Sequence, residues 1–158
     1  MALSASVDDD WGMDDERALC AVHEAGHVIV ALLVGVRVAG AEIGDAYRRG
    51  LQARTEFAGN WRRPAPWGRL AITLAGPLAE ATYTGRDVLA VLNDGRDFEA
   101  SDLCCAQREA RRLARLRHFQ NADHALLVAE WHAQRLLTAH WDFVMRAARQ
   151  MYTVGRIE

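Results

Sequence analysis

Two histidines four residues apart, with a glutamate directly after the first, stand at residues 23–27 as His-Glu-Ala-Gly-His. Residues four apart lie on one face of an α-helix, so both imidazoles can reach one metal ion. Zinc prefers four ligands in a tetrahedron, and a catalytic site leaves one position for water, whose pKa the metal lowers. The segment therefore predicts a zinc site in which His23 and His27 are ligands. Glu24 would accept the proton as water attacks a peptide carbonyl, and Gly26 would leave no side chain beside the metal.

The third protein ligand is not fixed by this segment. Val30 and Leu33 stand where the metzincin pattern requires Gly and His, so that class is excluded. Glu80, on a later predicted helix, is the candidate if the site is of the gluzincin type. An aspartate is the alternative, and the candidates are Asp87, Asp94, Asp97 and Asp102. The competing interpretation of the whole segment is a chance occurrence of two histidines and a glutamate in an amphipathic helix.

The elements that must position these residues follow from the apolar periodicity. A 3.6-residue period predicts a helix from about residue 14 to Leu33 that ends near Gly35. Alternating residues punctuated by glycines at 36–57 predict a small two- or three-stranded sheet. Further helices are expected over 67–83, 101–117 and 121–152. The fold class is therefore α+β and mostly helical, with the zinc-binding helix beside a small sheet and a helical bundle after it.

Composition limits the other function classes. The chain has 158 residues, of which 51% are hydrophobic and 25% charged, which predicts one domain over 14–158 after a flexible acidic tail at 1–13. The net charge of −2 lacks the excess of positive charge that is typical of proteins that bind nucleic acid. The longest charge-free apolar run, Val28–Val36, is far short of a membrane span. Three cysteines without a C-x-x-C pair favour a reducing, cytoplasmic compartment and exclude a thiolate zinc site.

Beyond the motif, the chain resembles the zinc peptidase domain of FtsH-type AAA proteases over about residues 15–155. Residues 23–27 look like the family's H-E-A-G-H. Residues 74–80, Leu-Ala-Gly-Pro-Leu-Ala-Glu, are similar to its L-G-G-R-A-A-E helix, with Pro77 in place of the arginine. Residues 100–106 resemble its A-S-N-D-L-x-x-A segment, whose aspartate is the third zinc ligand. The resemblance implies that His23, His27 and Asp102 hold Zn²⁺ and that Glu24 is the catalytic base.

The role of Glu80 stays open between two possibilities. It orients a zinc histidine by accepting its other N–H, or it is a helix carboxylate paired with one of the arginines. All 19 basic residues of the chain are arginines.

Several other features favour structural roles. His124, His132 and His140 recur every eight residues, which on a helix drifts about 80° from one face, so a second metal site is not expected. The arginines at 108–115 are interpreted as a solvated face, with docking of an acidic partner as the less favoured alternative. Trp61 and Trp67 are expected to pack at the core edge rather than to line a substrate groove.

The function expected from the sequence is that of a zinc metalloendopeptidase acting on a polypeptide substrate. The family's ATPase module and membrane anchor have no counterpart in these residues, and no phosphate-binding loop occurs, so hydrolysis is expected to be independent of ATP. Two alternatives remain: a gluzincin-like peptidase that clips a regulator, and a metal-holding protein-binding module without turnover. An intact Glu24 favours the enzymes, because a zinc holder does not need it. Substrate preference and oligomeric state do not follow from the sequence.

Overall fold

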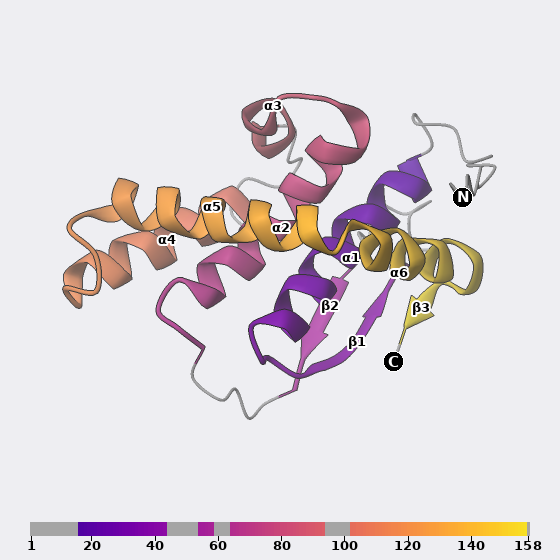
Figure 1. Cartoon of the computed structure of the whole chain (residues 1–158), viewed down its shortest axis with the longest axis horizontal. Coiled ribbons are helices and arrows are strands. Elements are labelled where there is room, and N and C mark those ends of the chain that lie inside the picture. The colour runs from indigo at the N-terminus through magenta and orange to yellow at the C-terminus, as the bar shows by residue number, and fades with distance from the viewer. Residues whose placement is uncertain (1–15, 44–53, 59–63, 94–101, 158) are drawn as a thin grey trace, which may run out of the picture.

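The computed structural model describes residues 16–43, 54–58, 64–93 and 102–157 (Figure 1). The predicted tail at 1–13 and Trp61 lie outside the described residues. The described part is mostly helical with one small antiparallel sheet, so the predicted α+β class is confirmed. Its elements are α1 (Glu16–Leu33), β1 (Val38–Glu42), β2 (Arg54–Phe57), α2 (Gly68–Thr84), α3 (Val88–Asn93), α4 (Asp102–Arg115), α5 (Ala122–Ala139), α6 (Trp141–Val154) and β3 (Arg156–Ile157).

Helix α1 is the centre of the fold. It packs most extensively against α2, then against α6, and it also contacts both β1 and β2. Alanine, valine and glycine fill most of its buried positions, so its backbone can approach neighbours closely on several sides. This explains why a helix carrying two histidines and a glutamate can still be largely buried: its remaining residues provide the apolar surface that the neighbours cover.

Two glycines set the spacing between α1 and α2. A Cβ on Gly26 would lie 2.5 Å from the carbonyl oxygen of Ala75 and 2.7 Å from the Cβ of Ala79, so only glycine fits there. Gly76 of α2 in turn faces α1, where a Cβ would collide with the ring nitrogens of both His23 and His27. The two helices therefore pack backbone to backbone at the level of the histidines.

Gly35 ends the first helix, as predicted. Its φ of +82° is a left-handed conformation that glycine adopts without strain, and the N–H of Val36 donates to the carbonyl of Ala31 at 2.8 Å. The chain then enters β1, which pairs antiparallel with β2 in the register Ala41 to Thr55. This turn places the sheet against α1 directly after the helix.

The third strand of the sheet comes from the other end of the chain. The strand order is β2-β1-β3, and Ala41 of β1 pairs with Ile157 of β3. The sequence predicted a sheet confined to 36–57 and gave no sign of β3, because two residues are too short for an alternating pattern. Gly155, with φ +85°, ends α6 and turns the chain back onto β1.

The prediction of one helix over 121–152 was wrong. The helix is broken at His140, whose φ of −127° is not helical, so that α5 and α6 are separate. Helix α5 packs on α2 and α4, whereas α6 packs on α1. The apolar period continues from Leu137 to Val144 without a proline or glycine, so the sequence carries no local signal for a break that packing on two different helices imposes.

None of the helices in the described ranges has both the length and the apolar character needed to cross a bilayer.

Candidate metal centre

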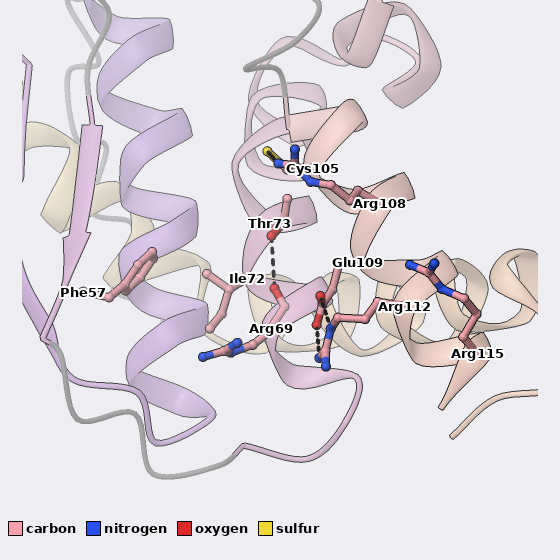
Figure 2. Close-up of a pocket in the computed structure, with 9 residues that line it drawn as sticks. All are labelled: Phe57, Arg69, Ile72, Thr73, Cys105, Arg108, Glu109, Arg112 and Arg115. Carbon is pink, nitrogen blue, oxygen red and sulfur yellow. Dashed lines mark hydrogen bonds and ion pairs between the residues drawn. The ribbon is translucent and has the colours of Figure 1, made fainter. Parts of the chain in front are cut away.

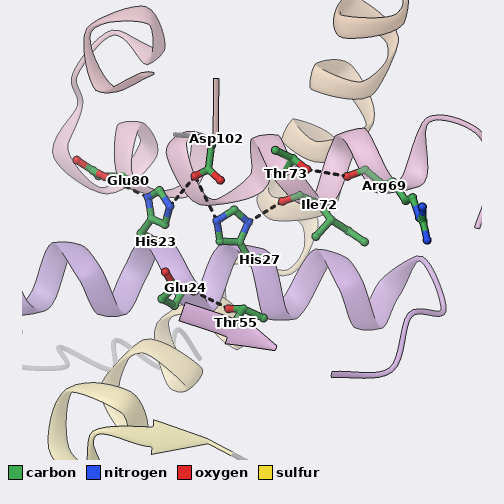
Figure 3. Close-up of polar contacts among 9 residues, drawn as sticks. All are labelled: His23, Glu24, His27, Thr55, Arg69, Ile72, Thr73, Glu80 and Asp102. Carbon is green, nitrogen blue, oxygen red and sulfur yellow. Dashed lines mark hydrogen bonds and ion pairs between the residues drawn. The ribbon is translucent and has the colours of Figure 1, made fainter. Parts of the chain in front are cut away.

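Three predicted ligands converge between α1, α2 and the start of α4 (Figure 3). His23 and His27 project from α1 towards α2, and their rings meet edge to face with centroids 4.9 Å apart. Asp102 is the first residue of α4, and its Oδ2 lies 2.9 Å from His23 Nε2 and 3.4 Å from His27 Nε2. One carboxylate oxygen therefore faces the same nitrogen of both rings.

The opposite nitrogen of each ring has its own acceptor. His27 Nδ1 donates to the carbonyl oxygen of Ile72 at 2.7 Å. His23 Nδ1 donates to Glu80 Oε2 at 3.3 Å. Since both Nδ1 atoms are occupied as donors, both Nε2 atoms are the ones turned towards Asp102, and they are the atoms available as ligands.

The donor set fits a small divalent cation. Within the described part of the chain, His23, His27 and Asp102 are the group of ligating side chains that could hold a metal ion, and their ligand atoms all lie within 4.8 Å of one another. Metal–ligand bonds of about 2.0–2.2 Å in a tetrahedron imply ligand–ligand distances of about 3.3–3.6 Å. The 3.4 Å between Asp102 and His27 falls in that range, whereas the 2.9 Å between Asp102 and His23 is the length of a hydrogen bond, so these two atoms would move slightly apart around an ion.

The electrostatics of the site favour positive charge. Burial lowers the pKa of His23, but hydrogen bonds to Asp102 and Glu80 and the charges of Asp102 and Glu24 outweigh it, and the pKa rises to about 10. Burial likewise lowers the pKa of His27. The charge of Asp102 and a hydrogen bond to Asp102 raise this pKa by more than burial lowers it, so the net shift is upward. The negative charges that hold these protons would also favour a divalent cation, which would have to displace the protons to bind.

The pKa of Asp102 is shifted well below its usual range. Burial alone would raise it, but the charge of His27 and hydrogen bonds with His23 and His27 have the larger combined effect. Asp102 is therefore an ionised carboxylate at neutral pH, which is the state that a metal ligand requires.

Glu24 lies on a different side of α1 from the histidines, towards the sheet (Figure 3). Its carboxylate is buried, and Oε2 accepts a hydrogen bond of 2.6 Å from the hydroxyl of Thr55 on β2. Among the described residues, β2 pairs with β1 along one edge and no strand pairs with its other edge. The glutamate of the motif is thus fixed beside an edge strand, on the side of α1 that faces the sheet.

The glycine that leaves space at the rings is not the one the sequence pointed to. Gly26 was expected to leave no side chain beside the metal, but it packs against Ala75 and Ala79 of α2. Gly76 has that role instead: a Cβ there would come within 2.6 Å of His23 Nε2 and closer still to His27 Nε2. The error arose because the sequence shows neighbours along one helix, whereas the space at a ring tip is set by the helix opposite.

The remaining candidate ligands lie elsewhere or outside the described residues. Glu80 contacts the Nδ1 side of His23, away from the Nε2 atoms that face Asp102. Asp87 accepts a hydrogen bond of 2.8 Å from the N–H of Leu89 at the start of α3, and Asp94 and Asp97 are outside the described residues.

The histidines of the C-terminal helices have other surroundings. His132 stacks on Trp67 with ring centroids 3.8 Å apart and nearly parallel planes. Neither it nor His124 or His140 belongs to a group of metal-ligating side chains in the described ranges.

Thr55, Ile72 and Gly76 complete the site, and the sequence analysis did not single them out. The one sequence feature that could have pointed to Gly76 is its place in the segment that resembles the FtsH-type helix. A backbone carbonyl and a single threonine in a short strand carry no pattern that would reveal them.

No protein-family model matches this chain, and no curated protein matches it.

Proposed function

We propose that this protein is a zinc-dependent metallopeptidase, similar to the peptidase domain of FtsH-type proteases, that hydrolyses peptide bonds in the cytoplasm without ATP. The observation that carries the proposal is the arrangement of the two histidines. Both present Nε2 to the same oxygen of Asp102, while each Nδ1 is held by a separate acceptor. An incidental pair of helix histidines has no reason to share both features.

Three side chains hold the metal in this proposal, namely His23, His27 and Asp102. A bound zinc ion supplies Lewis acidity, in that it polarises a peptide carbonyl and lowers the pKa of water. Glu80 positions the ring of His23 through Nδ1 and adds negative charge behind it, so we assign it an orienting role rather than that of a ligand.

Glu24 is the general base. The hydrogen bond from Thr55 fixes one carboxylate oxygen and thereby the direction of the group. A positioned carboxylate can accept a proton from the attacking water and pass it to the leaving amine. Because Thr55 belongs to edge strand β2, a substrate chain that adds to this edge would pass next to Glu24.

The test is the substitution Glu24→Gln. Glutamine keeps the shape and can still accept the hydrogen bond from Thr55, but it cannot take a proton at neutral pH. Zinc content, measured by elemental analysis, should stay at the wild-type level, and hydrolysis of casein should fall by about 10²–10⁴-fold. A chelator should stop the wild-type protein, zinc should restore it, and ATP should leave its rate unchanged.

Two results would contradict the proposal. Equal digestion by wild type and Glu24→Gln would remove Glu24 from the chemistry. Failure of zinc-loaded wild type to cleave any flexible substrate would leave the metal-holding binding module as the better description.

A further inference from the structure

A cavity of about 500 Å³ opens beside the metal centre, between β2, α2 and α4 (Figure 2). Its walls combine two apolar side chains, Phe57 and Ile72, with four arginines, namely Arg69, Arg108, Arg112 and Arg115. Glu109 is the acidic residue among the side chains that line it. The cavity is therefore positively charged, whereas the adjacent metal centre is rich in carboxylates.

The cavity borders the metal centre on all three elements. On α2, Ile72 lines the cavity and its carbonyl holds His27 Nδ1. On α4, Cys105 lies one turn after Asp102. On β2, Phe57 follows Thr55 by two residues and so lies on the same face of the strand, about 6.6 Å further along.

The cavity already binds one carboxylate, which belongs to the protein itself. The guanidinium of Arg112 donates to both oxygens of Glu109, at 2.6 and 2.7 Å. This hydrogen bonding, together with the charges of Arg112 and Arg69, lowers the pKa of Glu109 against the opposing effect of burial. Arg108 donates to Cys105 Sγ at 3.5 Å, which is a weak acceptor compared with a carboxylate. The surface is thus chemically suited to a second carboxylate at Arg108.

We propose that this cavity is a specificity subsite that accepts an acidic side chain of the substrate close to the scissile bond. The inference rests on the proposed peptidase function. An extended peptide beside β2, with its scissile carbonyl near Glu24, would bring a side chain two residues away over Phe57 and into the cavity. Phe57 and Ile72 would contact the methylene groups of a glutamate, and Arg108 would bind its carboxylate with charge-assisted hydrogen bonds.

The same chemistry has a second possible source, which is the free C-terminal carboxylate of a peptide. Three fluorescein-labelled twelve-residue peptides of Ala, Ser and Gly distinguish the two. The first has three central glutamates and an amidated C-terminus, the second has three glutamines and the same amide, and the third has the glutamines with a free carboxylate. Three consecutive positions ensure that one of them reaches the cavity whatever the register.

Binding is measured by fluorescence anisotropy with the zinc-loaded full chain carrying Glu24→Gln, which prevents hydrolysis. We expect the glutamate peptide to bind about three- to fivefold more tightly than the glutamine amide, since an ion pair with an exposed arginine contributes at most about that much. Adding Arg108→Gln should reduce the difference to about twofold or less. The matched control is Arg111→Gln, which removes the same charge from an exposed position of α4 outside the cavity.

Each result decides the proposal. Equal affinity for the glutamate and glutamine amides, no binding of either, or an equal loss in the Arg108 and Arg111 variants would overturn it. Preference for the free carboxylate over both amides would replace it with a C-terminal subsite. Because binding is measured separately from turnover, the two failures can be told apart: casein left uncleaved while the glutamate preference is intact would overturn the proposed function and leave a cavity that binds acidic peptides.

Discussion

The candidate metal centre and the arginine-lined cavity share α2 and α4 but differ in charge and in burial. At the centre, Glu24 and His27 are buried and every polar group described above has a partner within the protein. In the cavity, Arg108, Arg112 and Arg115 are exposed. The difference indicates that α4 serves both: its first residue, Asp102, belongs to the centre, and its last turn carries Arg112 and Arg115, where basic side chains also complement the helix dipole.

The comparison teaches which region tolerates change. A buried polar group left without its partner costs about 1–3 kcal/mol or more, whereas an exposed ion pair contributes about 0–1 kcal/mol. Substitutions at the centre should therefore have large effects on stability, and substitutions in the cavity should have small ones.

The largest effect is expected from removing a histidine of the centre. His23→Ala or His27→Ala leaves two protein ligands, so the protein should lose stoichiometric zinc. Elemental analysis of the purified variants measures this, and circular dichroism checks that the fold is kept. His118→Ala, at an exposed histidine after α4, is the control and should keep its zinc. Wild-type zinc content in either ligand variant would dismiss the site.

The next effect concerns pH. The raised pKa of His23, about 10, means that a metal ion must displace a proton throughout the neutral range. Zinc affinity should therefore rise by about tenfold or more for each pH unit between pH 6 and 8, which a zinc indicator calibrated at each pH can measure. An affinity that levels off above pH 6.5 would show that the histidine has an ordinary pKa.

The same shifts fix how metal-free stability depends on pH. The folded-state pKa of His23 is raised, so its contribution is complete below about 6.5 and is lost as pH rises towards 10. The folded-state pKa of Asp102 is lowered, so its contribution is complete above its unfolded-state pKa and is lost as pH falls from there towards the folded-state pKa. Between these limits the pair of charges supports the fold, which chemical denaturation at several pH values can check.

A smaller effect on zinc affinity is expected at Glu80 than at Asp102. Asp102→Ala removes a ligand and should abolish tight zinc binding, whereas Glu80→Ala removes only the acceptor of His23 Nδ1 and should weaken it by about 10–100-fold. Competition with a chelator of known affinity measures both. The reverse order, with a small loss at Asp102 and a complete one at Glu80, would favour the gluzincin-like alternative.

The smallest effect is expected in the cavity. Glu109→Gln removes the carboxylate that Arg112 binds, so a peptide with glutamates should bind about two- to threefold more tightly in anisotropy measurements. Zinc affinity should not change, because Glu109 has no contact with the centre among the interactions described. A matching loss of zinc would show that the two regions are coupled and would break the comparison.

The sequence by itself determined several elements and the spacing of the ionisable side chains on the central helix. Local patterns reveal the apolar periods of α1, α2 and α4. The four-residue spacing shows that His23 and His27 share one helix face, and a single glycine, Gly35, marks the end of α1. Asp102 was favoured as the third candidate ligand through a resemblance rather than a pattern. No spacing rule connects Asp102 with His23, which lies 79 positions earlier in the sequence.

Only the tertiary structure decided the rest, because those features depend on which surfaces meet. Packing on two different helices separates α5 from α6 at His140, although the apolar period is continuous. The strand β3 exists because Gly155 turns the chain onto β1. Three further features join segments that are distant in the sequence. Gly76 lies against the histidine rings of α1, Thr55 fixes Glu24, and arginines of α2 and α4 line one cavity. A local pattern cannot encode such contacts, since each is set by the burial of apolar surface over the whole domain.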